Sequence, residues 1–210
     1  MNEKIMMLGV DIGKRNDPTA IAIAIVEPRI NEAGRDEPHY SIPYLRRLLP
    51  LGQPYPQLAK EIIRIAEAAL NRFRYMPGGV PPYTNHYVRF YLDVTGVGDG
   101  VVDLIKPLLR DKFHILPCRF IHGDKLAAKA GEYRPGKSWF ANRLQVLSEG
   151  RQIHISPENP EAEAVAKELM DFDIDVDETT GIDRYGAMRP GTHDDMVCAL
   201  GLACLINPFR

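Results

Sequence analysis

Two apolar runs near the N-terminus, separated by a short turn, place the strongest constraint on how this 210-residue chain folds. The first covers residues 5–11. The second covers residues 19–26 (TAIAIAIV) and follows the turn signal Asn16-Asp17-Pro18. Apolar, β-branched runs bounded by Asn, Asp and Pro are typical of strands. The pattern predicts two strands joined by a tight loop, with a third strand over residues 40–49 completing an antiparallel meander.

After the meander, helical and extended patterns alternate along the chain. Apolar residues at helical spacing predict helices over residues 58–73, 98–109, 136–148, 160–172 and 192–206, the last with Thr192 or His193 near its N-cap. Strands are expected at 88–94, 113–121 and 152–155. This order predicts an α/β fold, in which one mixed sheet, antiparallel in its first three strands and then parallel, is flanked by helices. We expect a single domain over residues 1–210.

Composition excludes several classes of protein. Apolar residues make up 45% of the chain and charged residues 26%, the balance of a soluble globular protein. No apolar run is long enough to span a membrane, so we expect no membrane association. Cys118, Cys198 and Cys204 form no metal-binding or disulfide pattern, and the first residues show no signal-peptide pattern. We therefore expect a protein of a reducing cytoplasm.

Aspartates stand at three structurally informative places. Asp11 closes the first strand, Asp93 closes the strand over residues 88–94, and Asp194 and Asp195 open the final helix. If the two strands are adjacent and parallel, Asp11 and Asp93 lie at the same sheet edge. Each of these residues alone is more simply explained as a loop or helix cap, and it is their joint placement that indicates a site.

Carboxylates gathered in this way repel one another unless a positive charge lies among them, and hard divalent cations prefer oxygen ligands. Two cations held roughly 3.5–4 Å apart activate a water and stabilise the leaving oxygen of a phosphodiester. The pattern therefore predicts a site for Mg²⁺ or Mn²⁺.

Three motifs carry a family resemblance: GVDIGxxxDxTAIAI, YLDVTGVGDGVVDLI and HDDMVCALGLA. In this order and spacing they resemble the nuclease domain of the large terminase of bacterial viruses, which has a ribonuclease H-like fold related to the resolvase RuvC. The resemblance extends from Leu8 to about Leu205. It implies that Asp11, Asp93 and the Asp194-Asp195 pair are catalytic metal ligands, without saying which of the pair is primary.

The resemblance implies a two-metal endonuclease that hydrolyses double-stranded DNA with little sequence specificity, as in viral genome packaging in the host cytoplasm. A complete large terminase carries an ATPase motor before its nuclease. We therefore expect an excised domain or a free-standing relative, with such a motor and a portal protein as partners. The alternatives are a RuvC-like resolvase of branched DNA and a non-catalytic docking module for the motor or portal. An actin-like phosphotransferase would need two such domains.

Basic residues concentrate between Arg119 and Arg143, where aromatic residues are interleaved. Cations with aromatics suit contacts to phosphates and stacking on bases, although a solvated face is the simpler explanation of charge alone. We expect Phe140 to belong to the core. The candidates for DNA backbone contacts are Lys125, Lys129, Arg134 and Lys137, together with Arg184 and Arg189 from an expected hairpin over residues 180–189.

Three further features have competing explanations. Residues 131–138 match the nucleotide-binding pattern GxxxxGK[ST], but the residues before them are polar or helix-forming, whereas a P-loop follows a buried strand. Residues 171–177 alternate acidic and apolar side chains, which favours an exposed strand edge over a cation site. His193 either assists proton transfer or is a neighbour of the helix cap.

Overall fold

The computed structural model describes residues 4–13, 17–78, 88–96, 98–177, 182–187 and 194–209, with only the backbone of residues 171, 173–177 and 182–187. Within these ranges eight strands form one mixed sheet in the order β6-β7-β5-β4-β1-β2-β3-β8. Its strands are β1 (Ile5–Asp11), β2 (Thr19–Ile30), β3 (Asp36–Leu48), β4 (Val88–Asp93), β5 (His114–Cys118), β6 (Leu126–Lys129), β7 (Glu132–Pro135) and β8 (Ile153–Ile155). A separate two-stranded sheet pairs β9 (Phe172–Asp177) with β10 (Ile182–Ala187).

The directions of the strands confirm the expected mixed sheet. β2 runs antiparallel to β1 and to β3, so the first three strands form the predicted meander. β4 then lies parallel to β1 on the other side, and β5 lies parallel to β4. β1 is therefore a central strand with a partner on both sides, and both of its faces are available for packing.

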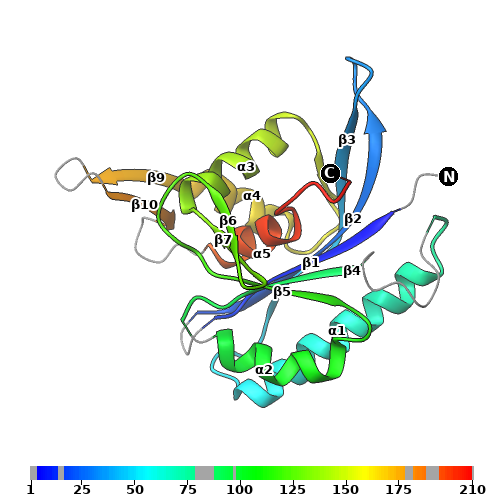
Figure 1. Cartoon of the computed structure of the whole chain (residues 1–210), viewed down its shortest axis with the longest axis vertical. Coiled ribbons are helices and arrows are strands. Elements are labelled where there is room, and N and C mark those ends of the chain that lie inside the picture. The colour runs from blue at the N-terminus through cyan, green and yellow to red at the C-terminus, as the bar shows by residue number, and fades with distance from the viewer. Residues whose placement is uncertain are drawn as a thin grey trace.

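Helices cover both faces of the sheet (Figure 1). The helices are α1 (Tyr55–Arg74), α2 (Gly98–Leu109), α3 (Lys137–Glu149), α4 (Ala162–Asp171) and α5 (Asp195–Ala203). α1 and α2 pack on one face, where they form one apolar cluster with alternate residues of β1, β2 and β4. α3, α4 and α5 lie on the other face, where the remaining alternate residues form a second cluster. No described helix is both long and apolar enough to cross a membrane.

The structure differs from the sequence-based expectations at three places. The described part of the expected hairpin over residues 180–189 is one strand, β10, which pairs antiparallel with β9 over the acidic segment. The polar segment before Gly131 contains strand β6, because Ala130 (φ 53°) and Gly131 (φ 79°) turn the chain so that β6 and β7 pair as a hairpin. The final helix begins at Asp195 with Asp194 as its N-cap, whereas Thr192 and His193, the expected caps, lie outside the described residues.

Gly9 allows α5 to lie directly on the central strand. A Cβ atom at Gly9 would stand 2.1 Å from the carbonyl oxygen of Ala199 and 2.4 Å from the backbone nitrogen of Ala203. Both atoms belong to the backbone and have no side-chain freedom with which to move away. On the far side of α5, the ring of Phe140 fills the space above Gly201. Two glycines thus set the height of α5 above the sheet.

Replacing Gly9 with Ala is expected to lower the free energy of unfolding by about 1–3 kcal/mol, because the added methyl group overpacks a backbone contact. Denaturant unfolding followed by circular dichroism measures the change. The matched control is Gly100→Ala in α2, where an added Cβ meets nothing within 4 Å, so stability is retained or slightly raised. A Gly9→Ala protein as stable as the unaltered chain would contradict this account of the packing.

Candidate functional site

The ends of two central strands bring Asp11 and Asp93 to the same sheet edge. Val10 on β1 is paired with Leu92 on β4 in parallel register, and the two aspartates are the next residues of their strands. The two strands are therefore adjacent and parallel, which is the condition under which both aspartates lie at the same sheet edge. Side chains alternate between the two faces of a strand. Met7 and Tyr91 precede Asp11 and Asp93 by an even number of residues, and both pack in the apolar cluster on the α5 side of the sheet. Both aspartates therefore belong to that face.

A cavity of about 300 Å³ opens at this edge, and five aspartates line it. They are Asp11, Asp17, Asp93, Asp194 and Asp195. Asp17 comes from the loop between β1 and β2, and the last two come from the start of α5. The structure thus brings together all four aspartates that the sequence analysis singled out, and it adds Asp17.

Burial and the closeness of the carboxylates shift the pKa values of Asp11 and Asp93. Burial raises the pKa of the Asp11 carboxyl well above its ordinary value, and the negative charges of the neighbouring aspartates, Asp93 first among them, raise it further. Burial also raises the pKa of Asp93, while hydrogen bonds from Thr95 and the positive charges of Arg119 and Lys137 oppose that rise. Ionisation of Asp11 is therefore costly in the absence of a cation.

Asp93 is held by the loop that follows it. Its Oδ1 atom accepts a hydrogen bond of 2.7 Å from the backbone N–H of Thr95, and the Thr95 hydroxyl oxygen in turn accepts the N–H of Phe120 at 2.9 Å. Arg119 donates to the carbonyl oxygen of Val94 at 2.9 Å. These bonds tie the ends of β4 and β5 together, so the Asp93 carboxylate has a fixed direction.

Asp195 has a basic partner that the sequence analysis did not identify. Nε of Arg47, on β3, donates to Oδ2 of Asp195 at 2.8 Å, and the same guanidinium forms an ion pair with Glu168 on α4. Glu168 and Asp195 are both buried. Arg47 and Glu168 are 121 residues apart in the chain, which is why no local pattern revealed the pair.

The donor set of the cavity has the chemistry that a hard divalent cation requires, since carboxylate oxygens are the preferred ligands of Mg²⁺ and Mn²⁺. Among the described residues, however, no three or more His, Cys, Asp or Glu side chains are already close enough together to hold a metal ion. The aspartates surround the cavity without closing on its centre. Mutual repulsion of the carboxylates favours this open arrangement and contributes to the raised pKa of Asp11.

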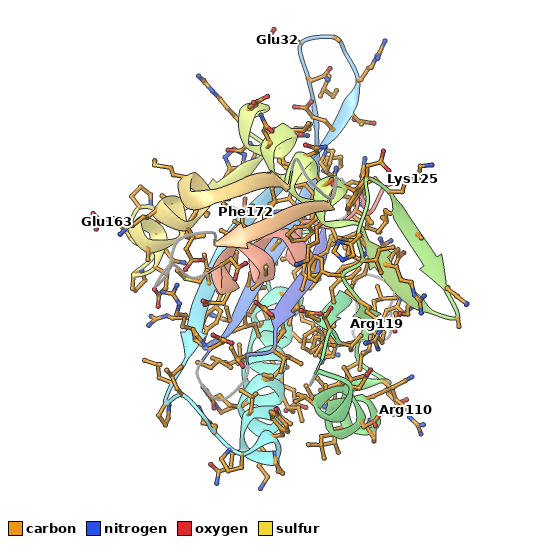
Figure 2. The ribbon with its side chains drawn as sticks, turned by 90° about the vertical axis from the view of Figure 1, so that its left-hand side faces the viewer. Glu32, Arg110, Arg119, Lys125, Glu163 and Phe172 are labelled. Atoms are coloured by element: carbon orange, nitrogen blue, oxygen red, sulfur yellow. The ribbon has the colours of Figure 1, made fainter. Side chains whose placement is uncertain are left out.

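The predicted DNA-contacting residues are distributed unevenly around this cavity. Lys137, the first residue of α3, lines it. Lys125 and Lys129 are exposed before and at the end of β6, and Arg134 is ion-paired with Glu132 at 2.8 Å. In Figure 2, Arg119 and Lys125 lie on the same side of the molecule. Arg189 and His193 lie outside the described residues, and for Arg184 only its backbone place in β10 is described.

The segment that matches the P-loop pattern has a different structure. Residues Glu132–Pro135 form strand β7, so they do not form the phosphate-wrapping loop that the pattern requires. Arg143, at the end of the basic stretch, donates to the Cys204 carbonyl oxygen and to the Tyr40 hydroxyl, which assigns it to the fold. Phe140 is buried, as expected.

Two further cavity residues were missed by sequence reasoning. Cys198 lies one turn into α5, where burial, with the surrounding carboxylates, raises the pKa of its thiol well above the ordinary value. Its i+3 and i+4 spacing from Asp195 and Asp194 was the available signal. Phe172, the first residue of β9, also lines the cavity (Figure 2). Cys118, Cys198 and Cys204 are all free thiols.

Comparison with known proteins identifies the fold. No protein-family model and no curated protein matches this chain. Among solved structures, it is similar to the nuclease domain of the large terminase of bacteriophage SPP1, which was crystallised with bound Mn. The alignment covers 95% of this chain and 84% of that one, with 14% sequence identity and a TM-score of 0.51. The chain therefore has the ribonuclease H-like fold that the resemblance implied.

The raised pKa of Asp11 predicts a dependence of stability on pH. The folded state binds the Asp11 proton more tightly than the unfolded state does, so in the absence of metal this residue's contribution to stability is lost as pH rises from about 4 through the folded-state pKa. Asp11→Asn removes the charge. It is therefore expected to raise the melting temperature of the metal-free protein at neutral pH by ~2–4 °C for each kcal/mol of relieved repulsion.

Thermal melts of both proteins in EDTA between pH 4 and 8 test this expectation. The gap in melting temperature should widen with pH and then level off. Asp36→Asn, on the exposed first residue of β3, is the control and should leave the melting temperature unchanged. A gap that is absent, or that narrows as pH rises, would show that Asp11 is not under this repulsion.

Proposed function

We propose that this protein is an endonuclease that uses divalent cations to hydrolyse phosphodiester bonds of double-stranded DNA with little sequence preference. The observation that carries the proposal is the convergence of Asp11, Asp93 and the first residues of α5 on one cavity at the edge of a ribonuclease H-like sheet. The similar nuclease domain from bacteriophage SPP1 was crystallised with Mn, which supports a divalent cation in such a fold.

In this proposal each aspartate has a defined task. Asp11 and Asp93 would hold the cations from the sheet side, and Asp194 and Asp195 would hold them from the start of α5. Bound Mg²⁺ or Mn²⁺, two ions in the full site, would supply Lewis acidity that lowers the pKa of the attacking water and offsets charge on the phosphate. Thr95 keeps Asp93 in a fixed direction, so less ordering remains to be done on binding.

Lys137 is placed to receive the substrate. It begins α3 at the rim of a cavity rich in carboxylates, and the first turn of α3 contains no acidic residue. A lysine charge added to the positive end of a helix dipole favours a phosphate group. Contacts of this kind bind the DNA backbone and carry no direct sequence information. Lys125 and Lys129 would extend the same backbone contacts, and an ATPase motor and portal protein would be partners in genome packaging.

Cleavage of supercoiled plasmid tests the proposal. With Mn²⁺ or Mg²⁺ the unaltered protein is expected to nick and linearise the plasmid, and EDTA should abolish this. Asp11→Asn and Asp93→Asn are each expected to lower the rate by at least about 100-fold, because each removes a charged cation ligand. The exposed control Asp36→Asn should cut at the rate of the unaltered protein.

Three results would contradict the proposal or redirect it. Cleavage that persists in EDTA, or in both Asn variants, would remove the carboxylates from the chemistry. Preference for a four-way junction over linear duplex would favour a resolvase. A folded protein that cuts no DNA with either cation would favour a docking module that binds the motor or portal.

The role of Lys137 is tested by DNA binding in EDTA, where no cleavage occurs. Lys137→Gln is expected to weaken binding of a labelled duplex severalfold and to reduce the slope of log affinity against log salt by about 1, because one phosphate contact is lost. Fluorescence anisotropy at several salt concentrations measures both. Lys60→Gln, exposed on α1 across the sheet, is the charge-matched control, and equal effects from the two variants would rule out a local contact.

A further inference from the structure

Arg47 lies in the same row of the sheet as Asp11, two strands away. Asp11 is paired with Ala20 on β2, and Ala20 is paired with Arg47 on β3. Directly opposed residues point to the same face, so Arg47 reaches the side of the sheet that α5 covers. The two strand spacings amount to ~10 Å, and the only side chain between them in this row is the fully buried methyl group of Ala20. The row therefore has room for the start of α5.

The guanidinium of Arg47 connects two buried carboxylates. Its Nε donates to Oδ2 of Asp195 at 2.8 Å, and its Nη2 donates to Oε1 of Glu168. The side chains of Glu168 and Asp195 are only 7% and 6% exposed. Buried carboxylates of this kind are costly unless they are paired and hydrogen-bonded, and Arg presents its donors in a fixed planar fork. One arginine therefore sets the direction of both acids.

Glu168 carries this constraint to the backbone of α5. Its second oxygen, Oε2, accepts the N–H of Met196 at 3.1 Å and the N–H of Val197 at 3.2 Å. These amides belong to the first turn of the helix, where no intrahelical acceptor exists. The N-cap residue, Asp194, makes no capping hydrogen bond with its own side chain. Glu168, a residue of α4, thus caps the first turn of α5 in place of the Asp194 side chain.

We propose that Arg47 is a positioning residue of the cation site. It orients Asp195 through one carboxylate oxygen, and through Glu168 it fixes the first turn of α5, so that this end of the helix faces Asp11 and Asp93. The inference rests on the proposed function only in taking these aspartates as cation ligands. Hydrogen-bonded partners that orient metal ligands change metal affinity by about 10- to 100-fold when they are removed.

Binding of Mn²⁺ to the full chain, followed by the electron paramagnetic resonance signal of free Mn²⁺, tests the inference without reference to cleavage. Arg47→Gln is expected to raise the Kd for Mn²⁺ about 10-fold or more. Arg47→Lys, which keeps the charge but has no planar fork, should give an intermediate Kd. The matched control is Arg46→Gln, one residue earlier on β3 and exposed, which should leave the Kd unchanged.

A second pair of variants separates positioning from loss of folding. Arg47→Gln leaves Glu168 buried without its cation, whereas the double variant Arg47→Gln/Glu168→Gln removes both charges and keeps an amide oxygen for the helix N–H groups. If this double variant has the circular dichroism spectrum of the unaltered chain and still binds Mn²⁺ about 10-fold more weakly, the effect belongs to the site. Glu163→Gln, exposed on the same helix, is the control for α4 (Figure 2).

The outcomes distinguish this inference from the proposed function. A folded Arg47→Gln protein that binds Mn²⁺ as tightly as the unaltered chain, or more tightly, overturns the positioning role and leaves the nuclease proposal standing. Unaltered protein that binds Mn²⁺ but cuts no DNA overturns the nuclease proposal and leaves the positioning role to be decided by the Kd values. Unaltered protein that binds no Mn²⁺ overturns both.

Discussion

The contact between Gly9 and the backbone of α5 is the constraint on which the rest of the structure depends. A strand residue with no side chain lets the helix lie directly against β1, and the ring of Phe140 presses from above on Gly201. This contact sets the level at which α5 begins. Because β1 ends at Asp11 and α5 begins at Asp195, the packing of these two elements decides which side chains meet at the sheet edge.

The same packing creates an electrostatic cost. Five aspartates around one cavity repel one another, and burial adds to the cost of ionising Asp11. Three basic residues offset part of it: Arg119 and Lys137 act on Asp93, and Arg47 forms an ion pair with Asp195. Because these charges are not fully neutralised, the cluster lowers the stability of the metal-free fold. A bound cation would restore that stability. Such a balance between stability and function is usual at a binding site.

Much of this architecture was predictable from local patterns. The strand runs, the helical spacing and the order of the elements predicted the mixed sheet, and the chain positions of Asp11 and Asp93 predicted that each of them ends a strand. These features depend on residues close together in sequence. Strand β6 was not predicted, because the turn at Ala130 and Gly131 outweighs the weak strand preference of the residues before it.

The residues that support the candidate site, Arg47 and Glu168, could not be predicted from the sequence for another reason. Arg47 stands beside Arg46 in β3, and only the alternation of faces separates the half-buried side chain of Arg47 from the exposed side chain of Arg46. Glu168 is one acidic residue among several in its helix, and its partners are contributed by β3 and α5. Such roles are set by contacts between distant segments, so a single sequence contains no local signal for them.

Anomalous diffraction from crystals of the protein grown or soaked with Mn²⁺ tests the central claim most directly, because it locates the cation without assuming any activity. The account predicts one or two Mn²⁺ peaks inside the cavity, within ligand distance of the carboxylates of Asp11 and Asp93 and of at least one of Asp194 and Asp195. Peaks found only at other surfaces, with these aspartates unliganded at saturating Mn²⁺, would contradict it.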